Sequence, residues 1–192
     1  ADAPVLTITS PVDGSKSNRE TVTVTGSIED AYLDVVTVNG QNATVTNGKY
    51  SKRILLEEGL NVITVEAIDL AGNTTEQSVT IDVGYTAPEI TNLVPTENKT
   101  LLSGDTVKIE FDSAPDLDAV FSILMPLTNI VGTSANALEL PMQETSPGHY
   151  VGYYTATRNV VAPGAKIEVK VTDDYGNVTT QRASGLLYIN QP

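Results

Sequence analysis

Residues Val62–Val83 read VITVEAIDLAGNTTEQSVTIDV, and this stretch decides how the rest of the chain is interpreted. Every second residue from Ile63 to Ala67 is apolar, which is the period of a β-strand with one buried face. The run stops at Gly72-Asn73, a turn signal at which a positive φ is inexpensive. A second alternating run then continues to Val83. The stretch therefore predicts a β-hairpin.

The same pattern occurs a second time, 104 positions later. Val65–Thr75 aligns without a gap with Val169–Thr179, and the second copy ends in an alternating run that contains Leu187 and Ile189. A hairpin that closes a domain twice predicts two domains. The restart of the pattern at Pro88, after the short linker Gly84–Pro88, places them at residues 1–84 and 85–192.

Composition supports an all-β chain and excludes several functions. Thr and Val are abundant, and no long helical window is present. With no cysteine there is no disulfide framework, thiolate metal site or thiol nucleophile. The net charge of −13 argues against nucleic acids and anionic membranes, and it fits solubility and calcium. No apolar run is long enough to cross a membrane and no signal peptide is present. We expect the chain to be a fragment of a longer protein, and we expect this fragment to be monomeric.

Turn signals recur every few residues along both halves. Asn39-Gly40 is the strongest hairpin signal of the chain, and Asn47-Gly48 predicts another tight turn. In the second half, Leu138–Met142 contains Pro141 and is therefore predicted to be an edge strand. About seven short strands per half are typical of an immunoglobulin-like or fibronectin-type β-sandwich. The predicted fold is thus two such sandwich domains in tandem.

Asp69 and Asp173 occupy the same position in the two copies of the hairpin. Each has the parity of the core residues before it, and an aspartate at a strand end usually accepts N–H bonds from the turn that follows. The alternative is a calcium ligand at the end of the domain, as in the Ala-x-Asp segment of cadherin-like repeats. Only Asp82 and Glu89 near the linker could add further ligands.

A second weak calcium candidate is the acidic segment that contains Asp112, Asp116 and Asp118, joined by Glu110. Calcium requires several oxygens that converge on one point. The spacing lacks the glycine and the closing glutamate of an EF-hand loop, so an acidic surface loop is the alternative. No other cofactor is predicted.

A catalytic centre is not predicted. Gly132-Thr-Ser134 resembles the segment that carries the nucleophile of subtilisin-family proteases, but such a serine needs a histidine and an aspartate within hydrogen-bond reach. The single histidine, His149, follows the serine and lies beside a Pro-Gly turn. We therefore expect the chain not to be an enzyme.

Tyrosines at 150, 153 and 154 place aromatic rings on both faces of one strand. Such rings can stack on sugars or on partner proteins, or they can fill the sandwich core. Surface aromatics in a row would favour carbohydrate binding, whereas a smooth polar surface would favour a spacer.

Several segments resemble known modules. Pro4–Gly14, Val22–Gly26, Val38–Gly40 and Gly59–Asn73 are similar to the Ig-like repeats of bacterial extracellular proteins. Glu144–Gly152 and Ile167–Asn177, with the ending Leu187–Asn190, resemble the region after the catalytic domain of bacillopeptidase F-type secreted serine proteases of the subtilisin family.

The resemblance implies that the chain is a non-catalytic accessory or spacer module of a secreted or cell-surface bacterial protein. It further implies that this parent protein is an extracellular serine protease. Its partner would be the upstream catalytic domain of the same polypeptide. The alternative is a binding module for cell-wall polysaccharide or a protein substrate.

Overall fold

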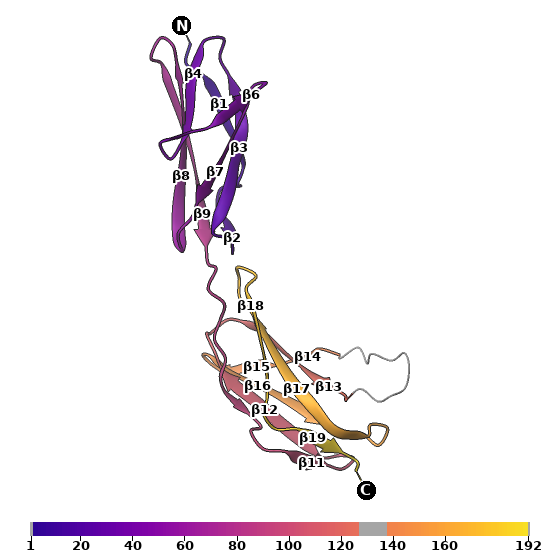
Figure 1. The fold of residues 1–192 in the computed structure, drawn as a ribbon. Coiled ribbons are helices and arrows are strands. Elements are labelled where there is room, and N and C mark those ends of the chain that lie inside the picture. The colour runs from indigo at the N-terminus through magenta and orange to yellow at the C-terminus, as the bar shows by residue number, and fades with distance from the viewer. Residues whose placement is uncertain (1, 127–137, 192) are drawn as a thin grey trace. The chain divides into compact units, whose positions relative to one another are not determined.

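The computed structural model describes residues 2–126 and 138–191, which form two compact units, Ala1–Thr86 (unit 1) and Ala87–Pro192 (unit 2). Figure 1 shows that both units consist of β-strands joined by turns and loops. The described residues contain no α-helix, and hence none that could cross a bilayer. The predicted all-β fold is confirmed.

Unit 1 is a sandwich of two sheets. Its strands are β1 (Val5–Ser10), β2 (Ser15–Ser17), β3 (Thr21–Glu29), β4 (Leu33–Val38), β5 (Gln41–Asn42), β6 (Thr44–Thr46), β7 (Lys49–Leu55), β8 (Gly59–Asp69) and β9 (Thr74–Val83). One sheet has the order β1-β3-β7-β6 and the other has the order β2-β9-β8-β4-β5. Alternate residues of both sheets point inward and form one core that includes Val24, Val36, Ile63 and Val65.

Unit 2 repeats this arrangement with longer connections. Its strands are β10 (Thr91–Val94), β11 (Lys99–Leu101), β12 (Thr106–Asp112), β13 (Asp118–Leu124), β14 (Leu140–Pro141), β15 (Gln143–Ser146), β16 (His149–Thr155), β17 (Ala162–Thr172), β18 (Val178–Arg182) and β19 (Leu187–Ile189). The sheets have the orders β10-β12-β16-β15 and β11-β19-β17-β13-β14, and β18 also pairs with β17. The short strand that contains Pro141 lies at a sheet edge, as predicted.

Three features differ from the expected seven strands per domain. In each unit a short strand pairs in parallel with the last one: β2 with β9, and β11 with β19. The second half of the repeated hairpin is one strand in unit 1, whereas in unit 2 it is divided into β18 and β19. Parallel partners come from distant parts of the chain, so no local turn signal announces them.

The predicted tight turns are confirmed by their backbone geometry. Asn39 and Gly40 have φ of 49° and 79°, and Asn47 and Gly48 have φ of 50° and 74°. Two successive positive values are the requirement of a type I′ turn, which matches the twist of the paired strands. In the repeated hairpins, Gly72 and Gly176 have φ of 86° and 87°.

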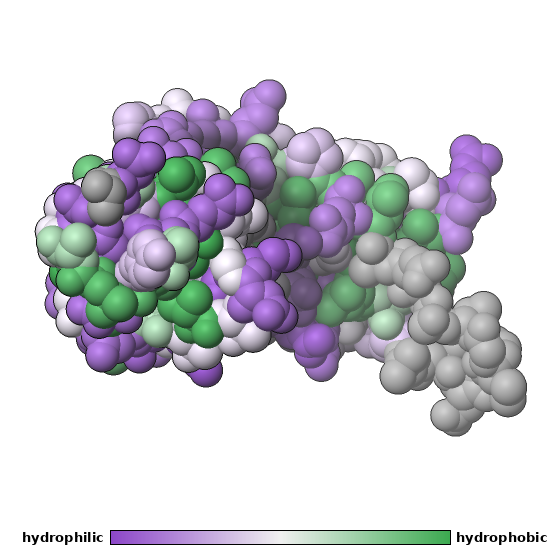
Figure 2. Space-filling view, turned by 90° about the horizontal axis from the view of Figure 1, so that it is seen from above, coloured by the Kyte–Doolittle hydropathy of each residue, from purple (hydrophilic) through white to green (hydrophobic). Residues whose placement is uncertain are grey.

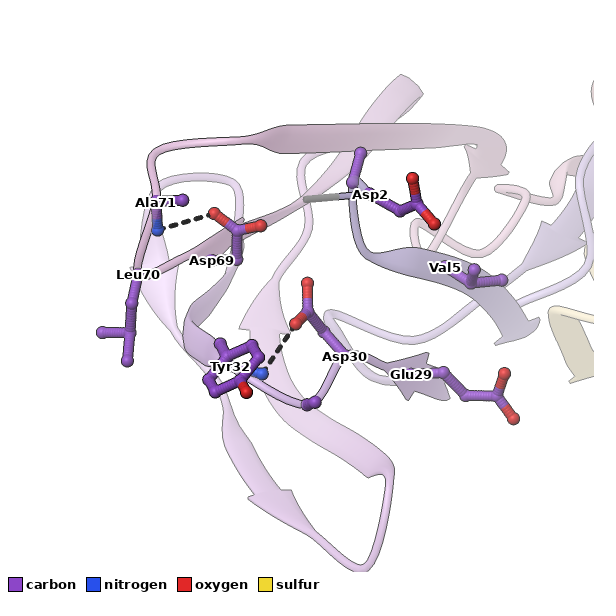
Figure 3. Close-up of a pocket in the computed structure, with 10 residues that line it drawn as sticks. Asp2, Val5, Glu29, Asp30, Tyr32, Asp69, Leu70 and Ala71 are labelled. Atoms are coloured by element: carbon purple, nitrogen blue, oxygen red, sulfur yellow. Dashed lines mark hydrogen bonds between the residues drawn. The ribbon is translucent and has the colours of Figure 1, made fainter.

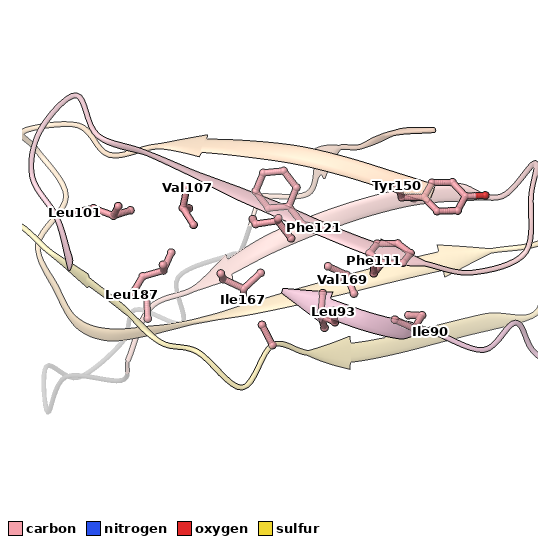
Figure 4. Close-up of a cluster of buried hydrophobic side chains, with 14 of the residues drawn as sticks. Ile90, Leu93, Leu101, Val107, Phe111, Phe121, Tyr150, Ile167, Val169 and Leu187 are labelled. Atoms are coloured by element: carbon pink, nitrogen blue, oxygen red, sulfur yellow. The ribbon is translucent and has the colours of Figure 1, made fainter. Parts of the chain in front are cut away.

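A buried tyrosine occupies corresponding positions of the two cores but makes different contacts. Tyr50 lies opposite Gly26 on β3 and donates a hydrogen bond of 2.7 Å to the carbonyl oxygen of Thr7. Tyr150 lies opposite Phe111 and stacks on it, with ring centroids 5.2 Å apart. Figure 4 shows this stacked pair at one end of the unit 2 core. Burial raises the pKa of Tyr50 to about 12 and also raises the pKa of Tyr150.

Candidate functional site

Asp69 closes the turn that follows β8. Its Oδ1 accepts hydrogen bonds of 2.9 Å from the backbone N–H groups of Ala71 and Asn73, and its Oδ2 accepts one of 2.8 Å from Asn73 Nδ2. The side chain of Asp69 is buried. The hydrogen bond from the Asn73 side chain is the main cause that lowers the pKa of Asp69, and it outweighs the opposing effect of burial.

Asp173 makes the same contacts after β17. Its Oδ1 accepts from the N–H groups of Tyr175 (2.9 Å) and Asn177 (2.8 Å), and its Oδ2 accepts from Asn177 Nδ2 (2.9 Å). The interpretation of both aspartates as turn acceptors is therefore confirmed. Because both oxygens of each carboxylate already have donors, a cation at either turn would have to compete with these hydrogen bonds.

The acidic segment of unit 2 does not converge on one point. Asp112 ends β12 and accepts a hydrogen bond of 2.9 Å from Asn92 Nδ2. Asp116 lies in the following loop with φ of 62°, and its N–H donates to the carboxylate of Glu144. Asp118 begins β13 opposite Thr172. Over residues 2–126 and 138–191, no group of three His, Asp or Glu side chains could hold a metal ion. The absence of calcium binding stays a prediction, and so does the alternative of a calcium site.

An ionic cluster on the outer face of unit 2 was missed by the sequence analysis. His149 lies on β16 between two acids of β12: its Nδ1 is 2.7 Å from Asp112 Oδ1 and its Nε2 is 3.1 Å from Glu110 Oε2. Lys108 Nζ lies 3.2 Å from the same oxygen of Glu110. Glu110 and Asp112 share one face of a strand, which the sequence shows, but only the register of β12 and β16 places His149 between them.

The cluster changes the ionisation of its members. The hydrogen bond to Asp112, followed by the one to Glu110, raises the pKa of His149. The His149 bond is also the main cause that lowers the pKa of Asp112. Burial acts to raise the pKa of Glu110, but the bonds from Lys108 and His149 together outweigh it and the pKa is lowered. The imidazole is therefore held by two carboxylates at the surface, an arrangement that joins two strands.

The protease-like segment Gly132-Thr-Ser134 lies outside the described residues. The histidine that a serine nucleophile would need has both ring nitrogens engaged by Asp112 and Glu110.

The tyrosines of β16 are distributed over both faces of the strand. Tyr150 is buried, Tyr154 packs against the core, and Tyr153 is 61% exposed. The other tyrosines of the described residues with a largely or partly open ring surface include Tyr32, in the β3–β4 loop, and Tyr85, which follows β9. These three rings belong to separate segments, Tyr32 and Tyr85 in unit 1 and Tyr153 in unit 2.

Comparisons with known proteins show which family model and which protein the chain is similar to. Residues 4–85 match the family model of glucodextranase domain B. The whole chain is 53% identical over 189 residues to part of Bacillopeptidase F from Bacillus subtilis (strain 168). That match covers 98% of this chain but only 13% of the length of the relative.

Solved structures share the fold at low sequence identity. The fibronectin(III)-like modules of Clostridium thermocellum CbhA are 16% identical, with a TM-score of 0.54 over 97% of this chain and 95% of that one. The titin I-band fragment I67–I69 is 13% identical, with a TM-score of 0.59 over 98% of this chain and 66% of that one. The chain is thus a pair of immunoglobulin-like and fibronectin III-like β-sandwich units that corresponds to a non-catalytic part of Bacillopeptidase F.

Proposed function

We propose that this chain is a spacer module of a secreted or surface-attached bacterial serine protease, carried on the same polypeptide as the catalytic domain. The observation that carries the proposal is the 53% identity over 98% of the chain to a small part of Bacillopeptidase F. Function resides in sites rather than in folds, and the likeness to titin and CbhA modules supports only the architecture.

The surface supports a spacer better than a binding module. Exposed tyrosines are dispersed over Tyr32, Tyr85 and Tyr153, whereas a carbohydrate surface stacks several rings along one sugar chain. The charge of −13 opposes association with other acidic molecules. The His149 cluster joins the neighbouring strands β12 and β16, and the ion pair of Lys170 and Glu139 connects β17 to the residue before β14, so these ionic contacts contribute to the sandwich itself.

The test is an exchange within Bacillopeptidase F. The matching region is replaced either by this chain or by the CbhA fibronectin(III)-like pair, which has a similar fold at 16% identity. A spacer requires only the fold, so both exchanges retain the hydrolysis rates of the parent towards a short peptide and towards casein. Loss of casein hydrolysis with the CbhA pair alone would show that specific surface residues are needed and would overturn the proposal.

A second measurement separates a spacer from the other classes. The purified chain is sedimented with insoluble peptidoglycan, cellulose or casein, with its Tyr153→Ser variant as a matched control. We expect no retention and no hydrolysis of peptide or ester substrates, with Ser134→Ala behaving like the parent chain. Retention that Tyr153→Ser abolishes would establish a binding module, and turnover that Ser134→Ala abolishes would establish an enzyme.

A further inference from the structure

A groove lies at the end of unit 1 that carries the N-terminal residues. Its walls come from the start of β1, the β3–β4 loop and the β8–β9 turn, and its volume is about 660 Å³. Figure 3 shows these three segments around the space, with Asp2, Asp30 and Asp69 on its sides and Tyr32 and Leu70 at one end. We call this feature the entry-end groove of unit 1.

The groove exposes apolar surface. Tyr32 is 68% exposed, Leu70 is 70% exposed and Val5 is 59% exposed, and alanines at 3, 31 and 71 complete the apolar part of the lining. Figure 2, which looks onto this end, shows hydrophobic residues gathered among hydrophilic ones. Exposed apolar side chains with polar residues around them are typical of a surface that another segment covers.

The rim is acidic and contains one unsatisfied oxygen. Asp2, Glu29, Asp30 and Asp69 line the groove together with no lysine, arginine or histidine. Asp30 Oδ1 accepts a hydrogen bond of 2.7 Å from the N–H of Tyr32, whereas Asp30 Oδ2 is buried and has no hydrogen-bond partner in the described part of the chain. A buried acceptor without a donor is costly, and a cationic donor would relieve that cost most effectively.

The corresponding end of unit 2 is where the polypeptide enters that unit. Thr179 Oγ1 donates to the carbonyl oxygen of Pro88, the last residue of the linker, and Thr75 Oγ1 donates in the same way to the carbonyl oxygen of Pro4. Both threonines follow the repeated hairpin turn. The end that bears the groove is therefore the entry end of unit 1, and Asp2 and Ala3 already form part of its wall.

We propose that the groove docks the polypeptide segment that precedes Asp2 in the longer protein, and that this segment brings a lysine or arginine to Asp30 and an apolar side chain to Tyr32 and Leu70. The inference rests on the proposed function, in which the chain is one module of a longer polypeptide. The chain spans 13% of its relative, so sequence outside it is extensive in that protein. A segment joined directly to the groove wall is present at high effective concentration, which favours docking even through a small contact area.

The test compares three forms of the chain: unextended, extended by about 15 native residues of Bacillopeptidase F that precede the matching region, and extended by a Gly-Ser segment of equal length. Hydroxyl-radical labelling of Tyr32 and the methyl resonances of Leu70 report on the groove, with the similarly exposed Tyr153 of unit 2 as the internal control. Docking predicts that the native extension lowers the labelling rate of Tyr32 severalfold and shifts the Leu70 methyl resonances, while the Gly-Ser extension and Tyr153 show no change.

Two variants determine the chemistry. Asp30→Asn keeps an oxygen for the Tyr32 N–H but replaces the free carboxylate oxygen, so it weakens the protection and makes it less sensitive to salt. Leu70→Ser removes the protection. Equal Tyr32 labelling in all three forms, or protection that depends on protein concentration and therefore reflects a second copy, would overturn the inference. These results leave the exchange experiment in Bacillopeptidase F unaffected, so the failure of one proposal is distinguishable from the failure of the other.

Discussion

Gly26 is the position at which unit 1 should tolerate substitution least. It lies in the middle of β3, between Ile8 of β1 and Tyr50 of β7. A Cβ atom at this position would lie 2.6 Å from Cζ of Tyr50, and closer still to the Tyr50 hydroxyl and to the carbonyl oxygen of Thr7. The tyrosine ring crosses over the glycine to reach that carbonyl oxygen, so the absence of a side chain is what permits the hydrogen bond.

The expected cost of Gly26→Ala combines three contributions. Forcing a methyl group into a filled site costs about 1–3 kcal/mol. Loss of the hydrogen bond between Tyr50 and Thr7 adds about 0.5–1.5 kcal/mol. The lower backbone entropy of alanine returns about 0.5–1 kcal/mol. The net destabilisation is about 0.5–4 kcal/mol, a substantial part of the roughly 4–13 kcal/mol that a domain of this size has.

The assay is differential scanning calorimetry of the whole chain, because each unit has its own core and the transition of unit 2 serves as the reference. For a domain of this length each kcal/mol corresponds to about 4–8 °C, so a loss of 2 kcal/mol lowers the midpoint of unit 1 by about 8–16 °C. The midpoint of unit 2 should not change.

A double-mutant cycle with Tyr50→Phe tests the reasoning further. Tyr50→Phe removes the hydroxyl that Gly26→Ala displaces, so both single variants lose the same hydrogen bond. The double variant should therefore be less destabilised than the sum by about 0.5–1.5 kcal/mol. Strict additivity, or an unchanged midpoint for Gly26→Ala, would refute the steric argument.

Three further predictions concern the turns, calcium and pH. Gly72→Val and Gly176→Val each force a β-branched residue to positive φ, which costs about 1–3 kcal/mol of the stability of the altered unit. At Gly72 the cost comes from the backbone alone, because a Cβ atom there would have no neighbouring atom within 4 Å. Unchanged melting of the altered unit would contradict the turn geometry. Millimolar calcium should not raise either melting midpoint relative to EDTA or magnesium, whereas a site with a Kd of about 10 μM would add about 2.7 kcal/mol in 1 mM calcium; a calcium-specific rise that Asp69→Asn abolishes would establish the cadherin-like alternative. Because the folded-state pKa of His149 is raised, the protonated imidazole contributes to the stability of unit 2 in full below about pH 6.5, and this contribution is lost as the pH rises through the folded-state pKa. The difference in the melting midpoint of unit 2 between the parent chain and His149→Gln should therefore shrink between pH 6 and pH 9. A constant difference would exclude this linkage.

Features governed by neighbouring residues could be predicted from the sequence. The Asn39-Gly40 turn adopts the expected positive φ values because its conformation depends on two adjacent residues. Asp69 and Asp173 accept the expected hydrogen bonds because the donors lie two and four residues further along the chain. The alternation of apolar residues around Val65 likewise identified the buried face of β8, since burial on a strand follows a period of two.

Only the tertiary structure decided the contacts between distant segments. The ionic cluster of His149 depends on the register of β12 against β16, and the partner of Tyr50 depends on the glycine that lies opposite it on β3. The entry-end groove of unit 1 brings together residues near 3, 31 and 70, and no local sequence pattern indicates that these three segments lie side by side. Turn chemistry acts over a few residues, whereas pairing register and the packing of two sheets are set by the burial of the whole core, so these features follow from the complete fold and not from any one stretch of the chain.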